Sequence, residues 1–191
     1  MTTELTVAKG LEGIIAAESE LSYVKGQEGI LEYVGIPIDQ LATNSSFEEV
    51  VFLLWNRRLP TQPELDKFKE QLAAKYALTD HTVQLLRHIP ASAGPMHALR
   101  TAISYIGCLL VDADEISPQM LRRHGLSLLA KMPTIVAYFD RLRKDLPLLL
   151  PDPNLGLAEN FLYMLNGEKP NETMTHALDV CLIIHADHGL N

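Results

Sequence analysis

The chain has 191 residues, of which 47% are apolar and 21% charged, and its formal net charge is −8. These values are ordinary for a globular protein, and the negative charge argues against a surface for nucleic acid or for anionic membranes. No apolar run reaches the length of a membrane span, and the first residues lack the basic start and apolar run of a secretory signal. Cys108 and Cys181 lie in apolar helical patterns, so we interpret them as small core residues of a reduced, cytoplasmic protein.

Residues 1–44 form an N-terminal segment that is punctuated by glycine. Two short apolar runs, 22–25 and 30–34, flank the turn sequence Gly-Gln-Glu-Gly and predict a small β-hairpin. A hairpin of this size is not stable alone in water, so we expect it to lie on the rest of the chain.

From residue 45 onward the apolar residues recur at helical spacing. Ser45 and Ser46 are each followed by a glutamate three residues later, which offers two alternative capping boxes for the first helix. A second capping box at 61–64 begins the next helix, and Thr79 or Asp80 begins a shorter one.

The middle of the chain carries two longer helical patterns. Residues 96–110 are apolar on most sides, which is typical of a helix buried deeply or in an oligomer interface. A long helix is predicted from 117 to about 144, with a kink or a break at Pro133. Its basic residues are expected to form a solvated face: Arg122, Arg123, Arg141, Arg143 and Lys144.

Two further helices close the chain. The first covers 157–165 and is stopped by Gly167. Asn171 is a good N-cap for the second, and Gly189 is a natural end for it. Residues 45–191 therefore consist of helices joined by short loops, and we predict an all-α, multi-helix fold with a small β-hairpin at its N-terminus.

The last helix carries the main candidate residues. Met174, Leu178, Cys181, His185 and His188 recur at offsets of four, three, four and three, which places them on one stripe of a helix. We expect this stripe to be buried and to deliver two imidazoles to the C-terminal end of the helix. The negative end of the helix dipole favours imidazolium there, so the pattern indicates an anion-binding site.

Spacing alone leaves three interpretations of this histidine pair. His185 and His188 are core residues satisfied by hydrogen bonds, or ligand-binding residues, or metal ligands. A zinc site needs a third ligand, which the neighbouring sequence does not supply, so we expect no metal. Asp187 lies off the stripe, where it either orients a histidine of a neighbouring element or is solvated.

Arg57 and Arg58 follow the first long helix and are the other candidates for binding an anion. Arginines in this position either bind a phosphate or interact with the last carbonyls of their own helix, and we favour the second interpretation.

Several stretches together resemble the citrate synthase family. The sequence HADHGLN at 185–191 is similar to the substrate-histidine motif of that family, HADHE-x-N. PMHALRTAIS at 95–104, KMPTIVAYFDRLRK at 131–144 and PNLGLAENFLYMLNGEKP at 153–170 are similar to three further family segments. Residues 30–61 are similar to a fifth segment, and the resemblance extends in consistent order from about residue 10 to residue 191.

The chain departs from the family pattern at four positions. Val34 and Ile36 stand where the family motif YRGY has arginine and tyrosine, and His97 stands where aspartate is common. Gly189 replaces the glutamate that usually follows the substrate histidine, which puts in question how this helix end is held.

The resemblance implies an acyltransferase that condenses oxaloacetate with acetyl-CoA and water to give citrate and CoA, the first step of the tricarboxylic acid cycle. It implies that His188 contacts oxaloacetate, with His185 and Asn191 in support, and that no cofactor or metal is needed. It also implies a homodimer or higher homo-oligomer, with 96–110 as the candidate interface.

Family chains are about twice as long, and their catalytic histidine and aspartate would lie beyond Asn191. Residues 45–191 are therefore expected to be the helical part of a large domain that is cut before its C-terminal half, and the 191-residue chain alone is expected to be inactive. Two alternatives remain open. One is a 2-methylcitrate synthase that uses propionyl-CoA, and the other is a helical assembly module without catalysis.

Overall fold

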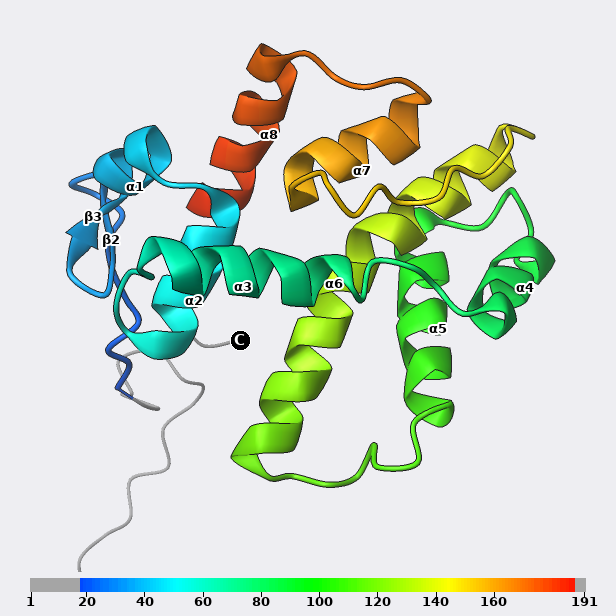
Figure 1. Ribbon diagram of the computed structural model, residues 1–191, viewed down its shortest axis with the longest axis horizontal. Helices are drawn as coiled ribbons and strands as arrows, with labels where there is room; N and C mark the ends of the chain where they lie inside the picture. Colours follow the sequence, from blue (N-terminus) through cyan, green and yellow to red (C-terminus); the bar gives the residue numbers. More distant parts are fainter. Residues whose placement is uncertain (1–17, 188–191) are drawn as a thin grey trace, which may run out of the picture.

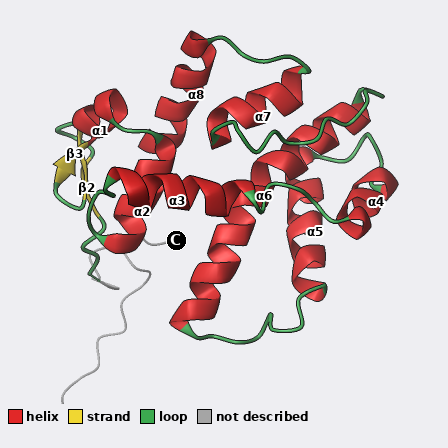
Figure 2. Cartoon of the chain, in the orientation of Figure 1, coloured by secondary structure: helices red, strands yellow, loops and turns green. Residues whose placement is uncertain are grey.

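A computed structural model describes residues 18–187 of the chain. Helices dominate the structure, and a small sheet lies at one edge (Figure 1). Figure 2 colours helices and strands separately, and the strands that it draws lie beside the short helix at Ile38–Asn44. The prediction of an all-α fold with a small N-terminal β element is confirmed. Within residues 18–187, no helix combines the length and the apolar character that a membrane span requires.

The elements follow one another with short connections. The strands are β1 (Ser22–Lys25), β2 (Ile30–Tyr33) and β3 (Ile36–Pro37), which form one antiparallel sheet in that order. The helices are α1 (Ile38–Asn44), α2 (Phe47–Asn56), α3 (Gln62–Ala73), α4 (Asp80–His88), α5 (Pro95–Cys108), α6 (Pro118–Arg143), α7 (Leu157–Asn166) and α8 (Glu172–Ile184).

The predicted hairpin is confirmed and is extended by a third strand. In the β1–β2 pair, Ser22 lies opposite Tyr33 and Lys25 lies opposite Ile30. After Tyr33 the chain turns sharply through Val34 and Gly35, whose φ angles are 52° and 75°, and returns as β3. A strand of two residues is too short for an alternating pattern, so the sequence did not reveal it.

The predicted capping boxes are confirmed, with one alternative eliminated. The Ser46 N–H donates to the Glu49 carboxylate at 2.7 Å, and the Ser46 hydroxyl accepts from the Glu49 N–H at 3.4 Å. The box is therefore that of Ser46, and Glu48 is buried elsewhere. Glu64 likewise accepts from the Thr61 N–H at 2.9 Å. The short helix α1 was not predicted, because no side chain caps its start.

Helix α5 is only half covered in this chain. Ala98, Ala102 and Ile106 are buried against α4 and α6. The opposite side faces solvent, where Met96 is 72% exposed and Cys108 is also exposed. Deep burial on all sides, one of the two predicted alternatives, is therefore not found within this chain, because Ala98, Ala102 and Ile106 recur every four residues and form a single contact face. The other alternative, burial in an oligomer interface, stays a prediction.

Helix α6 passes through Pro133 without a break. The expectation that all its basic residues are solvated is wrong for Arg141, which is 5% exposed. Its guanidinium donates to the carbonyl oxygens of Pro147 at 2.6 Å and Leu165 at 3.2 Å. These backbone acceptors satisfy the charged group, which explains how it is buried.

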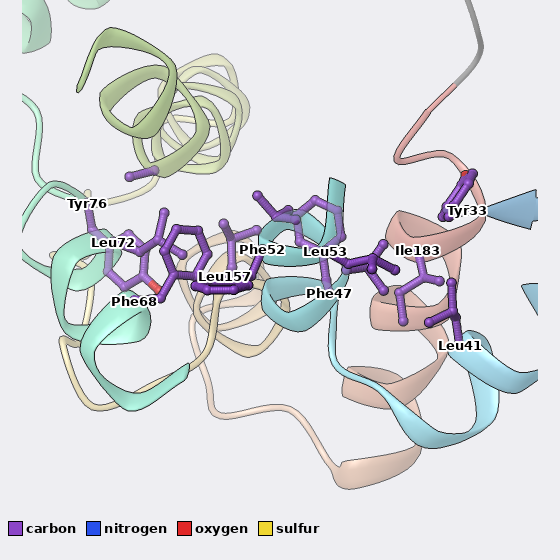
Figure 3. Close-up of a cluster of buried hydrophobic side chains, with 13 residues drawn as sticks. Tyr33, Leu41, Phe47, Phe52, Leu53, Phe68, Leu72, Tyr76, Leu157 and Ile183 are labelled. Carbon is purple, nitrogen blue, oxygen red and sulfur yellow. The ribbon is translucent and has the colours of Figure 1, made fainter. Parts of the chain in front are cut away.

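The apolar interior consists of two clusters. In the first, side chains run from Tyr76 and Phe68 through Leu53 of α2 to Ile183 of α8 and Tyr33 of β2 (Figure 3). The second cluster joins α4, α5, α6 and α7. The first cluster is the one that places the candidate site, because it fixes the sheet and the end of α8 on the same core.

Candidate functional site

Helix α8 begins as the sequence predicts and ends before the second histidine. The Asn171 side chain accepts from the Met174 N–H at 2.9 Å, so Asn171 is the N-cap. The helix ends at Ile184, and His185 is its C-cap. The predicted site residues His188 and Asn191 lie outside the described residues, so their roles stay predictions.

The predicted burial of the histidine stripe is wrong in this chain. Met174 is 45% exposed, and Cys181 and His185 are also exposed. Helix α8 instead buries the opposite face, on which Ile183 is fully buried against the first cluster. Helices α1, α2 and α7 contact α8, and Met174, Cys181 and His185 face away from the rest of the described chain.

His185 interacts with its own helix. Its Nδ1 lies 2.7 Å from the carbonyl oxygen of Cys181, one turn earlier. A carbonyl oxygen only accepts hydrogen bonds, so this contact requires the proton to be on Nδ1. The bond therefore fixes the ring at the C-terminal end of α8, where the helix dipole favours a cation.

Asp187 is not simply solvated, because it bonds to two residues of the small sheet. Its N–H donates to the Tyr33 hydroxyl at 3.2 Å, and that hydroxyl lies 3.3 Å from the Asp187 carbonyl oxygen, to which it donates. The Ser22 hydroxyl donates to the Asp187 carboxylate. The small sheet thus holds the residue that immediately precedes His188 in the sequence.

Tyr33 is well suited to this role because it is fully buried. Burial raises the pKa of Tyr33 above its ordinary value, although the hydrogen bond with the Asp187 backbone opposes that shift. The phenol therefore stays protonated at neutral pH and keeps its donor.

Sequence reasoning missed Tyr33 and Ser22. A signal was present, because a hairpin with a turn at 26–29 places Ser22 opposite Tyr33 on one face of the sheet. What the sequence did not reveal is that this face meets the end of α8.

A second feature is a cavity of about 560 Å³ between α2, α3, α7 and α8. Glu48 and Asp179 lie in its wall, and each accepts from the first N–H of another helix. The Glu48 carboxylate lies 2.8 Å from the Leu157 N–H, and the Asp179 carboxylate lies 3.1 Å from the Phe47 N–H. These carboxylates act as helix caps.

Burial raises the pKa of Asp179 above its ordinary value. The Phe47 N–H opposes the shift, while the negative charge of Glu48 adds to it. Burial also raises the pKa of Tyr76, with a further contribution from Glu48. The negative charge in the cavity wall is therefore partly compensated by two helix N-termini and by the cations of Lys69 and Lys169.

The arginine pair does not act as predicted. Arg57 pairs with Glu20 at 2.6 Å, and Arg58 pairs with Glu64 at 2.5 Å. Their partners are carboxylates instead of the last carbonyls of α2. In the part of the chain that the structure describes, no three His, Cys, Asp or Glu side chains are grouped so that they could hold a metal ion.

Residues 10–191 match the family model described as "Citrate synthase, C-terminal domain". The chain belongs to the citrate synthase family. The resemblance drawn from the sequence motifs is thereby confirmed, and it includes the segment around His185 and His188.

Three curated relatives illustrate the match to the citrate synthase family. Citrate synthase of Deinococcus radiodurans is 42% identical over 97% of this chain and 49% of its own length. Citrate synthase 2 of Bacillus subtilis is 43% identical over 98% of this chain and 50% of its own length. A 2-methylcitrate synthase of Mycobacterium tuberculosis is 38% identical over 97% of this chain and 47% of its own length. The chain thus spans about half the length of these relatives.

Solved structures agree with the sequence match. Citrate synthase from Pyrobaculum aerophilum superposes with a TM-score of 0.86 at 35% identity, over 93% of this chain and 46% of its own. The enzyme from Thermoplasma acidophilum also gives a TM-score of 0.86, at 26% identity, over 97% of this chain and 49% of its own. That structure is titled as a ternary complex of citrate synthase with carboxymethyl coenzyme A and oxaloacetate.

Proposed function

We propose that the enzyme containing this chain is a citrate synthase, an acyltransferase that forms citrate and CoA from oxaloacetate, acetyl-CoA and water. The observation that carries the proposal is the family match over residues 10–191, which includes the histidine motif. Relatives that are named citrate synthase and are 42–43% identical support it. The neighbouring structure with oxaloacetate and a CoA analogue supports the two substrates.

The proposed chemistry divides the work between this chain and the part of the family protein that it does not cover. In the latter, an aspartate removes a methyl proton from acetyl-CoA, and a histidine stabilises the enol or enolate that forms. The nucleophilic carbon attacks the keto carbon of oxaloacetate, and water then hydrolyses the citryl thioester. His188 binds oxaloacetate, and His185 and Asn191 support it. No metal or cofactor takes part, and the 191-residue chain alone is inactive.

Replacing His188 tests the site. In an enzyme of full family length, His188→Ala should remove a charge-assisted hydrogen bond of about 1.5–3 kcal/mol and raise the KM for oxaloacetate by about ten- to a hundredfold. His88→Ala is a matched control, because His88 is an exposed histidine whose Nδ1 contacts the Gln84 carbonyl oxygen at 2.7 Å. If folded His188→Ala kept the parent KM and kcat, the assignment of oxaloacetate to this helix end would be wrong.

The second candidate is 2-methylcitrate synthesis from propionyl-CoA. The relative from Mycobacterium tuberculosis that is named 2-methylcitrate synthase is 38% identical to this chain, which supports this alternative. We favour citrate synthesis because the relatives with that name reach 42–43%. Release of free CoA should be measured with oxaloacetate and each thioester in turn. A higher kcat/KM for propionyl-CoA than for acetyl-CoA would reverse the assignment.

The enzyme is further proposed to be a cytoplasmic homodimer or higher homo-oligomer that assembles through α5. The exposed side of α5 includes Met96 and Ser104, and a second copy of the chain could pack against it. Ser104→Arg should weaken that contact, and sedimentation velocity would detect a smaller species. The same charge at Thr175 on α8 is the control.

The remaining alternative is an assembly module without catalysis, and CoA release by the full-length protein would exclude it.

A further inference from the structure

We infer that the hydroxyls of Tyr33 and Ser22 are positioning groups that hold Asp187, the residue bonded in sequence to His188, and thereby act on oxaloacetate binding. This inference rests on the proposed function, because it concerns the same site. It assigns to the small sheet a role in substrate affinity that acts through Asp187, beyond the contribution of the sheet to the core.

The first argument is the register of the hairpin. Ser22 and Tyr33 are direct cross-strand partners in the β1–β2 pair. Side chains of directly opposite residues lie on the same face of a sheet, about 5 Å apart at their Cβ atoms. Two hydroxyl groups therefore converge on one residue at the end of α8, which is more than 150 positions away in the sequence.

The second argument is the way in which Asp187 is held. The Tyr33 hydroxyl is both an acceptor for the Asp187 N–H at 3.2 Å and a donor to the Asp187 carbonyl oxygen at 3.3 Å. The Ser22 hydroxyl adds a bond to the carboxylate. Contacts to the N–H, the carbonyl and the side chain of one residue restrain both its backbone and its side chain.

The hydrogen bonds of Tyr33 with Asp187 also take the place of helical backbone hydrogen bonds where α8 ends. The Ala186 N–H still donates to the Ile183 carbonyl oxygen at 3.1 Å, as in a tightened last turn. The next N–H, that of Asp187, points to Tyr33. The chain direction after α8 is thus set by the sheet.

The third argument is the rigidity of Tyr33 itself. Its ring is fully buried in the first cluster together with Leu41 and Ile183 (Figure 3). The following residue, Val34, has a positive φ of 52°, which is unusual for a β-branched residue, and its N–H donates to the Leu21 carbonyl oxygen at 2.9 Å. The hydroxyl is therefore fixed by packing and by a tight turn, as a positioning group must be.

The hydroxyls contact the residue before His188, so their removal should affect orientation and leave the chemistry of the imidazole unchanged. Small displacements of a binding group cost affinity when the ligand needs a defined geometry. Loss of the hydrogen bonds from Tyr33 and Ser22 to Asp187 should therefore raise the KM for oxaloacetate more than the KM for acetyl-CoA.

The test uses Tyr33→Phe in an enzyme of full family length, with Tyr23→Phe as the matched control. Tyr23 is on the neighbouring strand and is 50% exposed, so its loss removes a tyrosine hydroxyl from the same sheet without touching Asp187. Tyr33→Phe removes both hydrogen bonds to the Asp187 backbone and should raise the KM for oxaloacetate by about three- to tenfold, and change kcat less. Hydrogen exchange should speed up in the peptide that contains Asp187.

Ser22 provides a second test if Tyr33→Phe fails to fold. Ser22→Ala should raise the KM for oxaloacetate by about twofold to fivefold, and Ser22→Thr, which keeps the hydroxyl, should restore it. Restoration by threonine separates the hydrogen bond from a general loss of stability.

The outcomes distinguish this inference from the proposed function. If the parent enzyme condenses oxaloacetate but Tyr33→Phe behaves like Tyr23→Phe, or Ser22→Ala behaves like the parent, the positioning role is overturned and the function stands. If the parent neither binds nor consumes oxaloacetate, the proposed function fails and the inference fails with it. A selective rise in the KM for oxaloacetate with faster exchange at Asp187 supports both.

Discussion

Helices α7 and α8 are neighbours, yet their ends are held in opposite ways. Both ends of α7 are held by charged side chains from other helices, namely Glu48 of α2 at its start and Arg141 of α6 at its finish. The start of α8 is held by its own Asn171. Beyond its finish, Asp187 is held by the small sheet.

The difference follows from burial and from local sequence. The N-cap of α7 is Gly156, which has no side chain to accept a hydrogen bond, and Leu157 is buried. Water does not satisfy that end, so an acceptor must come from elsewhere in the fold. Asn171 is exposed and supplies its own acceptor. The signs at α7 also match its dipole, with a carboxylate at the start and a guanidinium at the end.

The largest expected loss of stability follows from removing Arg141, whose side chain holds the C-terminal end of α7. Arg141→Ala leaves the carbonyl oxygens of Pro147, Met164 and Leu165 without their donor. We expect the free energy of unfolding to fall by about 3 kcal/mol, because bonds to a charged donor are lost in a buried place. Arg143→Ala, two residues away and exposed, should cost less than about 1 kcal/mol. Equal urea midpoints for the two variants would contradict this account of α7.

The next largest loss of stability is expected from removing Glu48, whose carboxylate holds the N-terminal end of α7. Glu48→Ala removes the acceptor for the Leu157 N–H and should lower the free energy of unfolding by about 2 kcal/mol. The neighbouring Glu49 bonds to Ser46 within its own capping box, so Glu49→Ala should cost about 1 kcal/mol or less. Thermal melts of the two variants compare a distant cap with a local cap in adjacent positions. The comparison breaks down if Glu49→Ala is the more damaging change.

A smaller effect is expected at the start of α8. Asn171→Ala should lower the free energy of unfolding by about 1 kcal/mol, the usual cost of losing a local N-cap. Asn171→Asp keeps an acceptor next to the helix start and should retain most of the stability. Urea titration of both variants checks this, and a loss of similar size in each would show that the side-chain acceptor is not what matters.

The smallest effect concerns pH and Asp179, which caps α2 from α8. Its pKa is raised in the folded state, so the folded protein holds this proton more tightly than the unfolded chain does. Stability from this group is present at low pH and is lost as the pH rises from about 4 through the raised pKa. Asp179→Asn keeps an oxygen for the Phe47 N–H but has no such dependence. Its free energy of unfolding should therefore gain on the parent over that interval, and parallel curves from pH 4 to neutrality would refute the assignment.

The local rules of helix formation could be predicted from neighbouring residues. The capping box at Ser46, the caps at Thr79 and Asn171, and the stop at Gly167 all follow from contacts within about four positions. The family was also accessible from the sequence, because its motifs are stretches of contiguous residues. The hairpin register, which places Ser22 opposite Tyr33, followed from the length of its turn.

Only the tertiary structure decided which faces and charges are buried. The stripe of α8 that includes Met174 and His185 looks like a core face in sequence, yet this chain covers the other side of the helix. Arg141 and Glu48 look like surface charges, yet each is buried because a distant helix end needs a partner of its sign. Local propensity depends on residues within one or two turns, whereas burial depends on which elements pack together. The sequence therefore determined the helix ends that have a local capping or stop residue, whereas packing determined the end of α8 at Ile184 and the partners of the buried helix ends.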